Sequence, residues 1–468
     1  MSQPLAAPFS RHPGARTWPL AVVAMAGAAA ANAFVAVNPI LGVTVALPFT
    51  ALPFLLARAS IRLTAVVVGA LVVFQSSQEV GPAKFAYVGV AGLCMVISAA
   101  RIWKARDPSL QILRPLVPAT MALAAMIGVS GIVGQAGGVE LGDWARDVLP
   151  YLLLVILPIV GADAALDTSP RWLEGFIGVL GVMGAVGITL DWLARRDVSS
   201  LGVGRVLLST TVLVALGFSL AITRAGLGPR RIAWLLVALG ILAALLLSGS
   251  RTHLVLLAGL AGVVGASRKA RIRVASATRI GIAIGIGVTL LLPWAAARVI
   301  DNPQFITSRV RSAQLVLTGH ADSDQSFDER RLSYGWATSQ LKAHPWMGTG
   351  PGFRYANARL YADEGHFTLD TPFITPAKFG LVGTAVIVSY LVALVVCVHR
   401  SRRLIGYRPT HTVARGWATI LIALLPFGSS LEDKGFAISV MLLVALVTAQ
   451  TRVASTEPGL APAGDAVR

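Results

Sequence analysis

Long apolar runs constrain this chain more than any other feature. They recur along nearly its whole length, and most exceed the roughly 17 residues that a helix needs to cross a hydrocarbon core. Charged residues make up only 13% of the sequence, whereas a soluble globular domain carries about 25%. We therefore predict an all-α, polytopic membrane protein with about 12–14 spans. The candidate spans are 19–37, 39–57, 63–77, 84–100, 115–134, 147–162, 173–194, 206–223, 232–250, 252–267, 278–297, 372–398, 416–430 and 435–450.

The distribution of Lys and Arg predicts how these helices are oriented. The formal net charge of +18 is not read as a nucleic-acid signal, because basic residues of membrane proteins concentrate in cytoplasmic loops. We therefore predict a multi-pass protein of the cytoplasmic (inner) membrane. Counting Lys and Arg places both termini in the cytoplasm and residues 298–371 on the extracytoplasmic side. Arg195 and Arg196 fit this arrangement least well, since it puts a basic pair outside.

The same pattern divides the chain into four parts. Residues 1–297 hold the first eleven predicted helices, 298–371 form one long polar extracytoplasmic loop, 372–450 hold the last helices, and 451–468 form a polar cytoplasmic tail that we expect to be disordered. Two short helices are predicted inside the loop. Ser326 and Glu329 have the spacing of a capping box, so one helix should begin near Phe327 and end before Pro345. The other covers about 354–364.

Between these two helices, HPWMGTGPGF at 344–353 predicts a tight glycine-rich turn. The turn is either an anion-binding nest of backbone amides or a purely structural element. Asp322 and Asp324 form a D-x-D pattern, which in other transferases holds a metal, but a match of two residues in a polar loop is usually chance. Cys94 and Cys397 both lie in apolar spans and are interpreted as small core residues.

Three motifs in order suggest a family. They are SGSRTHL at 248–254, the pair Arg330-Arg331 followed by HPWMGTGPG, and a polar segment that leads into PFITPAKFGLVG at 372–383. Over about 230–400 the chain resembles the O-antigen ligase and O-antigen polymerase superfamily of membrane glycan transferases. The resemblance implies transfer of a glycan from an undecaprenyl-diphosphate carrier to an acceptor hydroxyl of a lipid or saccharide, with no metal and no cofactor.

The resemblance also implies roles for particular residues. Arg251 and one or both of Arg330 and Arg331 would bind the donor diphosphate, and a histidine would activate the acceptor. The family often has a His-Asn pair before the glycine that corresponds to Gly380, but the residues here are Leu369 and Asp370. The base is then either His366, the nearest histidine, or Asp370.

Chemistry argued from the residues agrees with these roles. Arginine stays protonated and presents a planar fork of donors to phosphate oxygens, so it can stabilise a diphosphate leaving group. An imidazole or carboxylate can remove the acceptor proton. Three alternatives stay open: a polymerase that extends lipid-linked repeat units, a transporter or flippase of lipid-linked saccharides, and a non-catalytic assembly protein. The transporter would place charges inside the spans and show symmetric halves, and no internal repeat is apparent.

Overall fold

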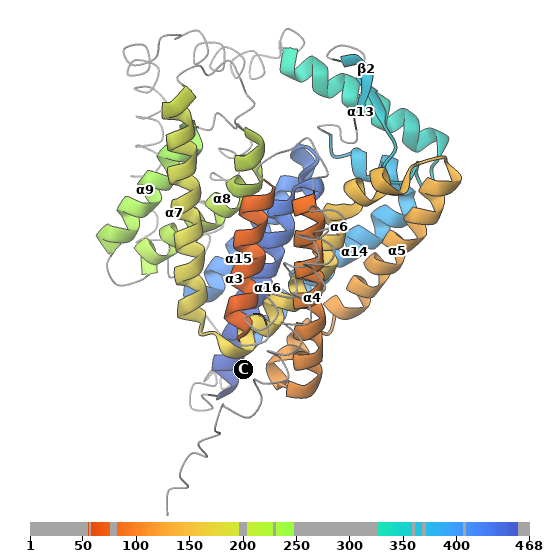
Figure 1. Cartoon of the computed structure of the whole chain (residues 1–468). Helices are drawn as coiled ribbons and strands as arrows, with labels where there is room; N and C mark the ends of the chain where they lie inside the picture. Colours follow the sequence, from red (N-terminus) through yellow and green to blue (C-terminus); the bar gives the residue numbers. More distant parts are fainter. Residues whose placement is uncertain are drawn as a thin grey trace, which may run out of the picture.

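The structure is a computed structural model, and it describes residues 55, 58–74, 82–195, 204–227, 231–247, 325–357, 361–366, 371–405 and 409–456. These residues form a bundle of helices, as the apolar runs predict (Figure 1). The helices of the first half are α3 (Ala59–Val73), α4 (Pro82–Ala105), η2 (Pro108–Leu113), α5 (Leu116–Ala136), α6 (Leu141–Asp167), α7 (Pro170–Arg195), α8 (Gly204–Leu227) and α9 (Arg231–Leu247). The second half holds α13 (Gln325–Ala343), β1 (Tyr355–Asn357), β2 (Tyr361–His366), α14 (Ile374–Ile405), α15 (Pro409–Leu424), η5 (Leu425–Phe427), η6 (Ser430–Glu432) and α16 (Lys434–Thr456).

Six of the described helices are long and apolar enough to cross a membrane. They cover Lys84–Ala105, Leu116–Ala136, Leu141–Asp167, Pro170–Leu190, Ile374–Ser401 and Lys434–Ser455. Four shorter apolar helices also fall on predicted spans, at Ala59–Val73, Val212–Ala225, Arg231–Leu245 and Val413–Leu424. The prediction of a polytopic helical membrane protein is confirmed. The predicted spans 19–37, 252–267 and 278–297 lie outside the described residues, as does 39–57 apart from Leu55.

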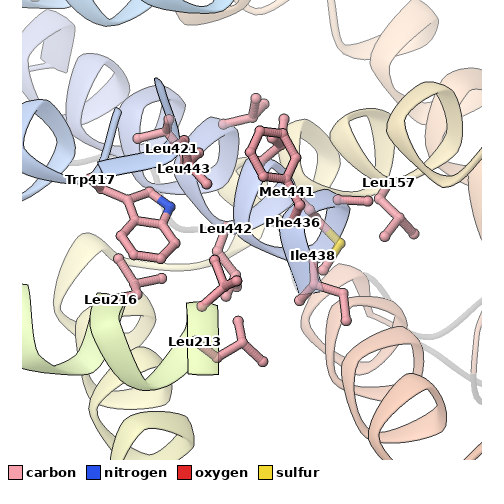
Figure 2. Packing of buried hydrophobic residues seen from close by; sticks show 14 of the residues in the cluster. Leu157, Leu213, Leu216, Trp417, Leu421, Phe436, Ile438, Met441, Leu442 and Leu443 are labelled. Atoms are coloured by element: carbon pink, nitrogen blue, oxygen red, sulfur yellow. The ribbon is translucent and has the colours of Figure 1, made fainter. Parts of the chain in front are cut away.

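Helix α16 is the centre of the bundle. It packs along α6 and is buried on nearly every side, and Figure 2 shows its residues Phe436, Met441 and Leu442 among side chains of α6, α8 and α15. The approach to α6 is close, because a Cβ at Gly161 would overlap the carbonyl group of Met441. Small residues are typical of such contacts between membrane helices, where the backbones must come near each other to gain packing energy.

The described part of the long loop contains one helix that was predicted and one β-hairpin that was not. Helix α13 covers Gln325–Ala343 and confirms the helix that was predicted to end before Pro345. The second predicted helix, at about 354–364, is wrong: the chain forms an antiparallel hairpin of β1 and β2, which lies with α13 at one end of the bundle (Figure 1). The reason is tertiary packing, since burying Tyr355 beside the start of α14 holds this segment extended despite its helix-forming Ala, Arg and Leu residues.

Candidate functional site

A break near the start of α14 organises the end of the bundle where the hairpin lies. Gly380 has φ 63° and ψ −169°, so the helical hydrogen bonds stop there and resume after it. The interruption leaves two amides, at Leu381 and Val382, and two carbonyls, at Ala377 and Lys378, without helical partners. Within a membrane such backbone groups must find partners inside the protein.

The glycine-rich turn supplies all four partners. The carbonyls of Pro345 and Trp346 accept from the amides of Leu381 and Val382 at 2.8 and 3.2 Å. In return, the amides of Thr349 and Gly350 donate to the carbonyls of Ala377 and Lys378, each at 2.9 Å. The turn therefore fits into the break, and each element satisfies the backbone of the other.

This fit depends on glycine at two facing positions. Gly348 has φ 69°, and a Cβ there would overlap the backbone of Lys378. Gly380 has φ 63°, and a Cβ there would overlap the backbone of Trp346. Both residues need a left-handed conformation and a contact that no side chain would permit.

The same contacts decide between the two interpretations of the turn. The amides of Gly348, Thr349 and Gly350 donate to carbonyls of His344, Ala377 and Lys378, and the amide of Gly352 donates to a carboxylate oxygen of Asp147. Pro351 has no amide hydrogen. All the amides of 348–352 are therefore engaged within the protein, and the structure favours the structural turn over an anion-binding nest.

A buried charged cluster of Lys378, Asp147 and Glu432 lies on the bundle side of the turn and binds it. The Lys378 ammonium is fully buried and donates to Asp147 Oδ1 at 2.6 Å and to Glu432 Oε1 at 2.5 Å. Asp147 belongs to α6 and Glu432 to η6, so the cluster joins three elements. The Tyr151 hydroxyl contributes from α6, 3.5 Å from Glu432 Oε1 and 3.3 Å from the Thr375 hydroxyl. Charges buried in a membrane span are paired, and they are a frequent mark of function.

A small core above the break gathers the loop elements. Ala337 of α13, Tyr355 of β1, and Ile374 and Ala377 of α14 are buried together. Tyr334 of α13 also packs edge-to-face on Phe373, with ring centroids 4.7 Å apart. Helix α13 and the hairpin are thus both held on the first turn of α14.

Comparison with known families addresses this same region. A family model described as O-antigen ligase matches residues 235–373. Residues 235–373 carry an O-antigen ligase family domain. No curated protein matches the chain. The matched part includes α13, the glycine turn and the hairpin, and it ends at the small core next to the break in α14.

The residues predicted to act in this O-antigen ligase domain are described to different extents. Arg330 and Arg331 are consecutive residues of α13, and the Arg331 side chain is exposed. His366 is the last residue of β2, where its backbone pairs with Tyr355. Arg251 and Asp370 lie outside the described residues. Through the small core, the structure brings the backbones carrying Arg331 and His366 to the same end of α14.

Other predictions concern metal and cysteine. Within the part of the chain that the structure describes, no group of three or more His, Cys, Asp or Glu side chains could hold a metal ion. Asp322 and Asp324 lie outside that part. Cys94 and Cys397 are both free and buried, which confirms their interpretation as core residues.

Sequence reasoning missed the cluster that supports the O-antigen ligase domain. Asp147, Lys378 and Glu432 all fall outside the matched residues 235–373, and none was predicted to be a site residue. A usable signal existed, because Asp147 and Lys378 each lie inside an apolar span, where a charge is costly without a partner. The sequence did not show which charges would meet.

Proposed function

We propose that the protein is a glycan transferase of the O-antigen ligase type, acting on an undecaprenyl-diphosphate-linked glycan. The observation that carries the proposal is the family match over residues 235–373, because that segment contains Arg251, Arg330, Arg331, His366 and Asp370 together. The chain thus holds both kinds of group that the reaction needs, cationic donors for the diphosphate and a base for the acceptor hydroxyl.

The reaction is a single displacement at the anomeric carbon. The acceptor oxygen forms a bond to that carbon while the bond from carbon to the diphosphate oxygen breaks, so the configuration inverts. Negative charge then grows on the leaving diphosphate. Arg251 and Arg331, with Arg330 beside it, would stabilise that charge through charge-assisted hydrogen bonds, and removing one such donor typically costs about 10²–10³ in rate.

The acceptor proton leaves to a base, for which the sequence offers His366 or Asp370. His366 has one observation in its favour, since its backbone lies in an ordered hairpin that is held on the start of α14. A neutral imidazole there would accept the proton as attack proceeds. Neither residue needs a metal to do so.

The orientation of the bundle supports a site on the extracytoplasmic side. Segments predicted to be cytoplasmic meet at the end of α6 far from Asp147: Arg101 pairs with Asp167 at 2.9 Å, and Arg452 lies 3.9 Å from Asp107. The turn, α13 and the hairpin lie at the other end. Basic residues mark the cytoplasmic side of inner-membrane proteins, so the proposed site faces outward with both termini inside.

The decisive experiment uses the purified full-length protein and an undecaprenyl-diphosphate glycan with EDTA present. We expect transfer in EDTA, and its loss in Arg251→Ala but not in a control that replaces the exposed Arg415 of α15 with alanine. Product that remains on the carrier would identify a polymerase instead of a ligase. Translocation across vesicles without any new glycosidic bond would identify the transporter, and transfer that survives in Arg251→Ala would contradict the arginine mechanism.

A further inference from the structure

Asp147 makes two contacts that no other described side chain makes together. Its Oδ1 accepts from the Lys378 ammonium at 2.6 Å, and its Oδ2 accepts from the Gly352 amide at 2.6 Å. One carboxylate thus ties the last glycine of the turn to the buried lysine of α14. Lys378 holds the turn a second time, because its own carbonyl accepts from the Gly350 amide.

The contacts that begin at Asp147 and Gly352 continue into the hairpin. Tyr355 follows three residues later, is fully buried, and places its hydroxyl 3.4 Å from that of Thr349 in the turn. In the register of the hairpin, Tyr355 pairs directly with His366. A continuous series of contacts therefore runs from Asp147 through Gly352 and Tyr355 to the backbone of His366.

The hairpin needs such an anchor. Its strands cover Tyr355–Asn357 and Tyr361–His366, and their register shifts between Ala356 and Asn357. An isolated two-stranded hairpin is marginally stable at best, so its position must come from what holds it. The described residues offer three attachments: the small core around Tyr355, the hydrogen bond from Gly352 to Asp147, and the exposed ion pair of Arg354 with Asp143 at 2.8 Å. Exposed ion pairs contribute little, so the first two hold the hairpin.

We propose that Asp147 is a positioning residue, which with Lys378 fixes the hairpin and thereby places His366 for proton removal. The role of His366 rests on the proposed function, whereas the fixing of the hairpin does not. Asp147 itself is buried beneath the turn, so the role we assign to it acts through the hairpin.

The cluster contains its own matched control. Asp147 and Glu432 each pair with the Lys378 ammonium, so removing the charge of either one leaves a lysine with one carboxylate partner. Of the two, only Asp147 is bonded to the Gly352 amide. In Asp147→Asn the single acceptor oxygen would face the stronger donor, the Lys378 ammonium, so the NH₂ group faces the Gly352 amide and that hydrogen bond is lost. In Glu432→Gln both contacts of Asp147 remain.

Hydrogen–deuterium exchange of the full-length protein in detergent tests the fixing of the hairpin without any substrate. We expect peptides covering 348–366 to exchange at least about tenfold faster in Asp147→Asn, and within about twofold of wild type in Glu432→Gln. Asp163→Asn serves as a second control, since Asp163 lies on the same helix as Asp147 but pairs with Arg62 of α3 and does not contact the turn. Equal changes in Asp147→Asn and Glu432→Gln, or no change in either, would overturn the proposal.

If Asp147→Asn does not fold, Asp147→Glu, which keeps the charge, should fold and still accelerate exchange at 348–366. Unchanged exchange there would overturn the proposal.

Transfer kinetics test the consequence for His366. A misplaced base should lower kcat on the order of 10²-fold while the KM for the lipid-linked donor stays within about twofold, because the diphosphate-binding arginines are unchanged. A variant with faster exchange and wild-type kcat would overturn the positioning role. If the wild-type protein transfers no glycan, the proposed function fails, and the exchange comparison still decides whether Asp147 holds the hairpin.

Discussion

The amide of Gly350 donates to the carbonyl oxygen of Lys378 over 2.9 Å, which links the long loop to the interior of a membrane helix. The donor belongs to the O-antigen ligase domain and the acceptor lies just outside it. Because the broken helix and the turn satisfy each other's backbone, neither can keep its conformation alone. Changes at the break in α14 should therefore alter both the stability of the bundle and the site above it.

Replacing Gly380 with alanine should destabilise the protein strongly. Alanine at φ 63° carries about 1–3 kcal/mol of backbone strain, and its Cβ would also overlap the Trp346 carbonyl. We expect a clear fall in the midpoint of thermal unfolding, followed in detergent by tryptophan fluorescence. Gly128→Ala in α5 is the matched control, since a Cβ there meets nothing within 4 Å, and its midpoint should stay equal or rise slightly. Equal midpoints for the two variants would contradict the fit of the turn into the break.

Replacing Lys378 with methionine should also be costly, for an electrostatic reason. Methionine keeps an unbranched, slightly shorter side chain but leaves Asp147 and Glu432 as two buried carboxylates without the ammonium between them. Removing one partner of a buried pair typically costs about 3–5 kcal/mol. Combining Lys378→Met with Asp147→Asn should recover part of that loss, because one of the uncompensated charges is gone.

A double-variant cycle measures this coupling. The two single variants and the combined one are unfolded by denaturant titration in mixed micelles, and the free energies of unfolding are compared. Strictly additive effects would mean that Lys378 and Asp147 do not interact in the folded protein.

The helical architecture could be predicted because it follows from local composition. Apolar length identified the six long spans, and the capping pair Ser326 and Glu329 together with Pro345 identified α13. The hairpin at 355–366 could not be predicted in this way. Apart from Tyr355 and Tyr361 its residues do not favour strands, and tertiary contacts such as the burial of Tyr355 with Ile374 select the extended conformation.

The candidate site was predictable in kind but not in geometry. The order of Arg330-Arg331, the glycine turn and the polar segment before Pro372 pointed to the O-antigen ligase family, and a family model of that description matches residues 235–373. The fit of the turn into α14 could not be predicted, because it depends on a break in the helix at Gly380. In the sequence, Gly380 looks like an ordinary glycine within a helix. The partner of Lys378 was equally hidden, because Asp147 lies far away in the sequence.

Tyr355 gives a prediction about pH. Burial raises the pKa of Tyr355 to about 12, although the nearby Lys378 ammonium lowers it. An unfolded tyrosine has a pKa of about 10, so the contribution of Tyr355 to stability is complete below pH 10 and is lost as the pH rises toward 12. Below pH 10, Tyr355→Phe should be less stable than wild type by about 0.5–1.5 kcal/mol, since it loses the contact with Thr349.

The difference in stability between the two proteins should shrink above pH 10 and change sign near pH 11. Between about pH 10 and pH 12, wild type loses about 1.4 kcal/mol per pH unit relative to the phenylalanine variant, because residue 355 ionises on unfolding only in wild type. Unfolding midpoints of both proteins at pH 7, 9 and 11 check this result. A constant difference across that range would show that the Tyr355 hydroxyl is exposed to water.

Replacing Arg331 should reduce catalysis and leave folding intact. Its side chain is exposed on α13, so Arg331→Ala should unfold at the wild-type temperature. If its guanidinium stabilises the departing diphosphate, kcat should fall about 10²–10³-fold. Arg331→Lys should recover only part of the rate, since lysine lacks the planar fork of donors. Wild-type turnover in Arg331→Ala, together with a large loss in Arg330→Ala, would assign the role to Arg330.

The identity of the base can be read from the pH dependence of transfer. If His366 removes the acceptor proton, kcat should fall tenfold per pH unit below about 6.5, where an ordinary imidazole becomes protonated. If Asp370 is the base, kcat should stay level down to about pH 4. The full-length protein is therefore assayed between pH 4.5 and 8 at saturating donor, alongside His366→Ala and Asp370→Asn. His366→Ala should abolish the acid limb and most of the activity, whereas the opposite pattern, with His366→Ala active and Asp370→Asn inactive, would move proton removal to Asp370.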